Sequence, residues 1–203
     1  MKQVTGSSLS KTQYGVSIQQ SLDGHSFSRP KPEEWHPTND PVQIELILPH
    51  AALVPETLYR KGFEADLLAA NGCPAAENET VVACDAQNGC VALVAVNRDL
   101  SDQIAGNFPN ARFSTPLEHQ PQERNKCVWI SRRENLLHVK IYDDNRLLFA
   151  EVIPVASETE IAYFIQRLGQ VFPLRDYGLL LAGDDPKKIR KWIGKAFKRV
   201  LCE

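Results

Sequence analysis

Apolar and polar residues alternate in the segments 14–20 (YGVSIQQ) and 42–49 (VQIELILP), which is the period of a half-buried β-strand. Asp23 and Gly24 follow the first segment, and they predict a turn into a return strand. Four prolines fall within 29–41, and this stretch is predicted to be a loop because proline cannot donate to a sheet ladder. We therefore expect three antiparallel strands in this part of the chain.

A helix is predicted over 54–72, where leucines and a phenylalanine recur at roughly helical spacing. Pro55 and Glu56 suit the first turn of a helix, because proline needs no donor there and a carboxylate complements the positive helix end. Gly72 suits its exit.

A hairpin, a short helix and a strand are predicted next. Asn88 and Gly89 stand between two apolar runs, and this dipeptide is a strong signal for a two-residue hairpin turn. The segment 98–109 carries apolar residues at helical spacing, and 111–115 (ARFST) is predicted to be a strand.

Three strands are predicted in 127–154, which reads CVWISRR, LLHVKIYDD and RLLFAEVIP with short turn sequences between them. A helix is predicted to follow, because Ser157 and Glu160 have the spacing of a capping box. The uniformly apolar run 177–183 predicts a buried strand.

A closing helix is predicted over 184–201, with Asp185 as its N-cap and Pro186 in its first position. Its polar face is rich in lysine and arginine and its segment after Pro186 has no acid. A basic helix of this kind fits an anionic partner or a membrane surface. We favour the other interpretation, a helix docked on the sheet with a solvated polar face, in which lysines near the negative helix end add stability.

Each half is thus predicted as three antiparallel strands, a helix, further strand and a helix. A right-handed crossover would return the later strand parallel to the first. The order βββαβα is the ribonuclease-H-like unit, and two units in tandem make the actin-like α/β architecture. The polar stretch 116–126 predicts the connection, so we place a first lobe at residues 1–118 and a second at 119–203.

Several short motifs resemble domain of unknown function 3822, an uncharacterised bacterial family. They are Asp-Gly-x-Ser-Phe at 23–27, Val-Pro-Glu-Thr-Leu at 54–58, the hairpin LLHVKIYDDNRLLFAEV and the acidic helix 158–164. The resemblance implies an actin-like fold similar to the cytoplasmic actin-like domains of type IV pilus and type II secretion assembly proteins. It implies no reaction, since the activity of the family is unknown.

An actin-like ATPase would need phosphate loops in the first hairpin of each lobe, with aspartate and glycine at the tips. The first tip offers Asp23 and Gly24 beside a bulky leucine, and the strand 177–183 ends at Gly183 and Asp184. These four residues are the candidate nucleotide-binding residues. The second tip carries two arginines and no glycine or aspartate, so we expect a degenerate site and no cofactor.

The remaining chemistry is sparse. The histidines and five cysteines are scattered without metal-ligand spacing, and no Walker loop, GxSxG, HExxH or GxGxxG is present. We therefore predict no metal and no catalytic residue, and an enzyme is not favoured. The net charge of −2 gives no general attraction to nucleic acid.

The composition is that of an ordinary globular protein, with 43% hydrophobic and 24% charged residues. No apolar run approaches the roughly 18 residues of a membrane span, and the N-terminus lacks the apolar core of a signal peptide. We expect a soluble cytoplasmic protein whose cysteines are reduced.

The first hypothesis for function is a scaffold or binding module with a protein partner, which acts through an interdomain cleft or an exposed strand edge. The second is a degenerate nucleotide-binding ATPase that uses Asp23, Asp184 and a metal. The third is a nucleic-acid-associated protein that uses the basic helix with Arg132 and Arg133.

Overall fold

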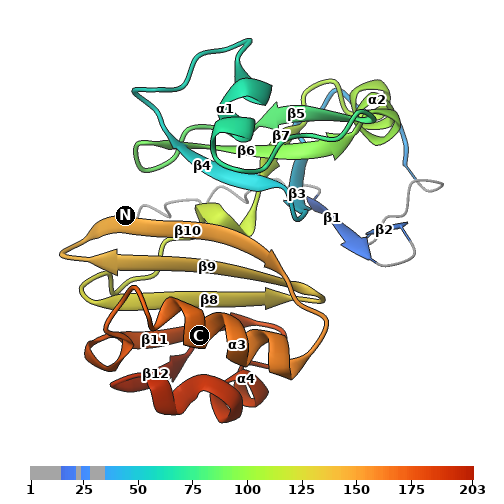
Figure 1. Ribbon diagram of the computed structural model, residues 1–203. Helices are drawn as coiled ribbons and strands as arrows, with labels where there is room; N and C mark the ends of the chain where they lie inside the picture. The colour runs from blue at the N-terminus through green and yellow to red at the C-terminus, as the bar shows by residue number, and fades with distance from the viewer. Residues whose placement is uncertain (1–14, 22–23, 28–34) are drawn as a thin grey trace, which may run out of the picture.

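The computed structural model describes residues 15–21, 24–27 and 35–203, which form three β-sheets (Figure 1). The first half of the chain forms sheet A, with strand order β2-β1-β3-β7, and sheet B, with order β4-β6-β5. The second half forms sheet C, with order β10-β9-β8-β11-β12.

Sheet A begins with the predicted hairpin. Strands β1 (Gly15–Ser21) and β2 (Gly24–Phe27) pair antiparallel. Asp23 lies outside the described residues. The third strand, β3 (Gln43–Ile47), pairs parallel to β1, so the prediction of three antiparallel strands is wrong. Strand β3 lies beside β1 and not beside β2 in the order β2-β1-β3-β7, so the two strands that share a direction become neighbours.

Sheet B consists of β4 (Ala51–Pro55), β5 (Glu79–Ala83) and β6 (Cys90–Asn97), all antiparallel. Its β5–β6 hairpin is confirmed, with Asn88 and Gly89 at φ values of 55° and 76°, as a two-residue turn of the primed type requires.

The helix predicted over 54–72 is wrong at its start. Pro55 ends β4, and Gly62 has a φ of 92°, which is outside the helical region. The helix α1 spans only Glu64–Ala70. The apolar run before Pro55 pairs with β6 instead, so sheet pairing overrides the local helix signal.

Helix α2 (Arg98–Asn107) follows β6 directly and returns the chain to sheet A, where β7 (Arg112–Ser114) pairs parallel to β3. The side chain of Asn97 caps α2 by accepting hydrogen bonds from the amides of Asp99 and Leu100. The predicted helix and strand are therefore confirmed.

Sheet C begins with the three predicted strands, β8 (Cys127–Arg133), β9 (Leu136–Asp143) and β10 (Arg146–Pro154), which pair antiparallel in sequence order. After helix α3 (Glu158–Leu168), strand β11 (Gly178–Gly183) pairs parallel to β8. This is the predicted βββαβ order.

The capping of α3 is confirmed, because the hydroxyl of Ser157 accepts the amide of Glu160 at 3.2 Å. The Glu160 carboxylate reaches back to the amide of Ala156 at 2.6 Å, one residue before the cap. Short 3₁₀ turns follow at η3 (Leu174–Asp176) and η4 (Gly194–Ala196).

The closing helix predicted over 184–201 is wrong in its second half. Helix α4 spans Pro186–Ile193, and β12 (Arg199–Cys202) then pairs parallel to β11 at the edge of sheet C. Asp185 does occupy the N-cap position, but its φ is 50° and its carboxylate accepts Lys188 Nζ at 2.7 Å instead of a helix amide.

Two hydrophobic cores cover the two faces of sheet C. One packs the face of β8, β9 and β11 against α3 and α4 (Figure 1). The other joins Leu136 and Val152 from sheet C with Ile44, Leu46 and further residues of the first half. Strand β9 and the first part of β8 are therefore buried on both faces, whereas the edge strands β10 and β12 keep exposed residues. No helix within the described residues has the length and apolarity to span a membrane.

Candidate functional site

The connection between the two halves lies against β9. It forms a 3₁₀ turn, η2 (Pro116–Glu118), in which the Glu118 carboxylate accepts the amide of Thr115 at 2.7 Å. Leu117 within this turn is fully buried in the core that the two halves share. The connection is thus a packed element of the fold.

Lys140 of β9 holds this connection. Only 1% of Lys140 is exposed, and its Nζ donates a hydrogen bond of 2.8 Å to the carbonyl oxygen of Leu117 and another to that of His119. The Nζ also lies 4.9 Å from the centre of the Trp129 ring, in the geometry of a cation–π contact. Burial lowers the pKa of Lys140 to about 8.

The ring of Trp129, which contacts Lys140, also packs against the ring of His119. Their rings stack with centres 5.1 Å apart, and the carboxylate of Glu203 lies 3.3 Å from both His119 Nε2 and Trp129 Nε1. The end of the chain is therefore joined to the connection between the halves through β8.

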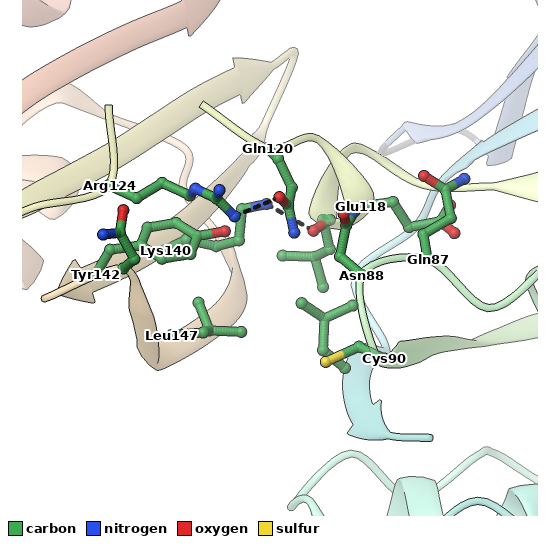
Figure 2. A pocket seen from close by; sticks show the side chains of 12 residues that line it. Gln87, Asn88, Cys90, Glu118, Gln120, Arg124, Lys140, Tyr142 and Leu147 are labelled. Atoms are coloured by element: carbon green, nitrogen blue, oxygen red, sulfur yellow. Dashed lines mark hydrogen bonds between the residues drawn. The ribbon is translucent and has the colours of Figure 1, made fainter. Parts of the chain in front are cut away.

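A pocket of about 310 Å³ opens between sheet B and sheet C at this junction. Figure 2 shows Arg124, Lys140 and Leu147 on one side of it and Asn88 and Cys90 on the other. The Arg124 guanidinium donates to the side-chain oxygen of Gln120 at 2.6 Å, which fixes one wall.

The groups around the pocket suit binding better than catalysis. Burial raises the pKa of the Cys90 thiol, so the thiol stays protonated and is a poor nucleophile. Burial also raises the pKa of Tyr142 to about 12. The amine of Lys140 is already bonded to two carbonyls. The arrangement offers hydrogen bonds to a small polar molecule and, in the part of the chain that is described, pairs no activated nucleophile with a base.

The sequence-predicted residues Gly183 and Asp184 lie elsewhere, at the end of β11 beside the turn between β8 and β9. Gly183 has a φ of 79°, and a Cβ on it would lie 2.0 Å from the carbonyl oxygen of Arg132. The amide of Asp184 donates to that same oxygen at 2.8 Å. Glycine is therefore required here for a close approach of two backbone segments.

The Asp184 carboxylate accepts the amide of Glu134 at 2.7 Å. The Arg132 side chain donates from Nε to the carbonyl of Glu134 at 2.9 Å, within its own turn. The end of β11 and the β8–β9 turn are thus joined to each other. Gly24, by contrast, belongs to sheet A, where it pairs with Ser21.

Comparison with known proteins gives a match in fold. The structure resembles a Bacteroides thetaiotaomicron protein with an actin-like ATPase fold and unknown function, with a TM-score of 0.73 and 17% identity over 94% of this chain and 91% of that one. This chain has the actin-like ATPase fold. No family model matches it, and no curated protein matches it either.

Two other solved structures resemble this actin-like chain more weakly. One is the cytoplasmic domain of EpsL, an inner-membrane component of the Vibrio cholerae type II secretion system, with a TM-score of 0.39 and 10% identity over 83% of this chain and 82% of that one. The other is AlfA in a filament bound to AMPPNP, with a TM-score of 0.36 and 10% identity over 78% of this chain and 52% of that one.

Of the four candidate nucleotide-binding residues, Gly183 and Asp184 are neighbours in sequence, and the structure places them beside Arg132 and Glu134 and not beside Gly24. It adds Lys140 and Glu118, which the sequence analysis missed. The sequence offers one signal for this site, the lysine in the middle of the apolar strand 136–143. That pattern alone is also typical of a strand with one solvated face. No group of three metal-ligating side chains comes together among the residues described.

Proposed function

We propose that this protein is a non-catalytic binding module of the actin-like fold whose nucleotide site is degenerate. The observation that carries the proposal is the bond between the Glu134 amide and the Asp184 carboxylate. A phosphate loop works by presenting free backbone amides to phosphate. Here the amide at the tip already has a carboxylate acceptor, and that carboxylate would repel a phosphate.

The close approach of β11 to the turn supports the same proposal. The carbonyl of Arg132 accepts the Asp184 amide, and the Arg132 side chain bonds to its own turn. A nucleotide would have to break these contacts before it could use either segment.

The fixed connection between the halves also supports a module without nucleotide-driven motion. Domain closure around a ligand requires a few hinge residues that change their backbone angles freely. Here Leu117 is buried and its carbonyl is bonded to Lys140. We propose that residues 1–118 and 119–203 are two lobes held at a constant angle.

We further propose a protein partner and a cytoplasmic location. All five cysteines are free thiols, which fits a reducing compartment. Membership of domain of unknown function 3822 stays a prediction, based on the motifs described above.

A thermal unfolding experiment with 1 mM ATP, with and without magnesium, tests the proposal. We expect no rise in Tm. A nucleotide bound with a Kd of about 10 μM would stabilise the fold by about 2.7 kcal/mol. This corresponds to a Tm rise of roughly 5–10 °C for a chain of this size.

Such a rise would overturn the proposal. If Asp23→Ala and Asp184→Ala then abolished the rise, the nucleotide-binding alternative would hold, with Asp23, Gly24, Gly183 and Asp184 as its site. An exposed aspartate of α2 offers a matched control, Asp102→Ala, which would leave such a rise unchanged.

A further inference from the structure

The outer surface of α4 and η4 carries an unusual concentration of positive charge. In this region Lys188 pairs with Asp185 and Arg199 pairs with Glu123. Five further exposed cations have no ion pair with any residue in the described ranges; they are Lys187, Arg190, Lys191, Lys195 and Lys198. These five residues are called the basic surface below.

An apolar groove of about 630 Å³ runs beside the basic surface, between α3 and α4. Ile165, Leu174 and Ile193 contribute to its lining, together with the half-buried Trp192. Arg175 and Lys195 are the charged residues that line it, and no carboxylate does. Lys195 also lines a second hollow of about 700 Å³ on the basic surface, so the groove and the basic surface are continuous.

We propose that the groove between α3 and α4 docks an acidic segment of a protein partner, with apolar side chains in the groove and carboxylates on the basic surface. The inference rests on the proposed function, because it names the partner class of the binding module. Charge complementarity selects the acidic partner, since Arg175 and Lys195 line the groove and the basic surface adjoins it. Apolar anchors that fill a pocket supply most of the affinity of such interfaces.

The geometry disfavours the two other anionic partners. A nucleic acid could place phosphates on the basic surface, but it has no aliphatic side chains to fill the apolar groove. A membrane-binding helix needs a free apolar face to enter the lipid. The isoleucines of α4, Ile189 and Ile193, are buried, with exposed fractions of 0% and 3%.

Fluorescence anisotropy with four probes tests the proposal on the full chain. The first probe is a labelled 15-residue peptide with leucines at helical spacing among glutamates and aspartates. The second is the same peptide with serine in place of every leucine. The third is single-stranded dT15. The fourth is a phosphatidylserine vesicle, whose binding is measured by co-sedimentation in place of anisotropy. We expect the first probe to bind at least about tenfold more tightly than each of the others.

Two sets of variants locate the binding. The double change Arg175→Glu and Lys195→Glu is expected to weaken binding of the first peptide about tenfold or more. The double change Arg60→Glu and Lys61→Glu alters the net charge equally at exposed residues before α1, at the far end of the molecule, and is expected to change binding less than twofold (Figure 1).

The third variant separates the groove from charge alone. Ala162 is an exposed residue of α3 that lines the groove, so Ala162→Arg would fill the groove while it adds a positive charge. Docking in the groove predicts weaker binding of the first peptide. Attraction by charge alone predicts equal or tighter binding, and that result would overturn the proposal.

The proposal also fails if the first peptide does not bind at low salt, if the serine peptide binds equally well, or if dT15 or the vesicles bind as tightly. The ATP experiment on the same sample keeps the two proposals apart. If the peptide does not bind and ATP does not raise the Tm, only the proposal about the groove is refuted. If ATP raises the Tm, the proposed non-catalytic function is refuted, whether or not the peptide binds.

Discussion

Lys140 donates a hydrogen bond from Nζ to the carbonyl oxygen of Leu117 at 2.8 Å, and this bond joins the connection between the two halves to strand β9 of sheet C. Lysine is rarely buried in this way, because removing its charge from water is costly. The two carbonyls and the Trp129 ring compensate for that cost. Lys140 therefore has a structural role, in which it stabilises the contact between β9 and the connection.

Lys140→Met is expected to lower the free energy of unfolding by about 2 kcal/mol or more, because two carbonyls lose their donor inside the protein. Urea denaturation followed by circular dichroism measures the change. Lys191→Met, at an exposed position of α4, should stay within about 0.5 kcal/mol of the parent. Equal stabilities of the two variants would show that the Lys140 contacts contribute nothing.

Gly183→Ala is expected to destabilise the protein by at least about 2 kcal/mol. The added Cβ would collide with the Arg132 carbonyl at 2.0 Å, and the φ of 79° is itself unfavourable for alanine. The control is Gly106→Ala in α2, where a Cβ meets no atom within 4 Å and alanine favours the helix. That variant should be as stable as the parent or more stable by up to about 1 kcal/mol.

Asp184→Ala is expected to cost about 1 kcal/mol, because the Glu134 amide loses a charged acceptor. Asp184→Asn keeps an acceptor oxygen and should recover about half of that loss. Comparing Asp184→Asn with Asp184→Ala separates two roles, because a hydrogen-bond acceptor needs only the oxygen, whereas a metal ligand needs the negative charge. If Asp184→Asn were as damaging as Asp184→Ala, the charge itself would be required, and a role as a simple acceptor would be ruled out.

We expect the protein to lose stability in acid because of His138. It is fully buried in β9, and burial lowers its pKa to about 4, against about 6.5 in the unfolded chain. Between pH 6.5 and pH 4 the unfolded state therefore binds more protons than the folded state. The free energy of unfolding should fall by about 3 kcal/mol across this window as the pH is lowered.

Urea denaturation at a series of pH values checks the prediction for His138. His138→Phe keeps a planar ring without a titrating group, so its stability should depend less steeply on pH than that of the parent. The same replacement at exposed His36 controls for the loss of one imidazole. Parallel curves for the parent and His138→Phe would show that His138 does not govern the acid response.

Local patterns predicted much of the second half. The strands of 127–154 follow from their alternation, and Ser157 marks the start of α3 as its capping pattern predicts. The alternation in β9 nevertheless misleads about burial. His138 and Lys140 fall on the face that would be solvated in a single sheet, but the first half and the connection cover that face.

The errors of prediction arise where a distant strand decides the outcome. Pro55 and Glu56 have the chemistry of a helix start, yet the segment before them pairs with β6. Val200 and Leu201 continue the apolar pattern of a helix, but they pair with β11. Such pairings join residues far apart in sequence, so no local window contains them. The groove between α3 and α4 is equally invisible in sequence, because it exists only after two helices pack.

The shared core has a consequence for how the protein unfolds. Leu136 and Val152 of sheet C pack in one cluster with Ile44 and Leu46 of sheet A, so neither half can lose its structure without exposing apolar surface of the other. Such coupling makes the two halves cooperative. Calorimetry should therefore record one heat-absorption peak, with equal calorimetric and van't Hoff enthalpies, for a fold built from two units.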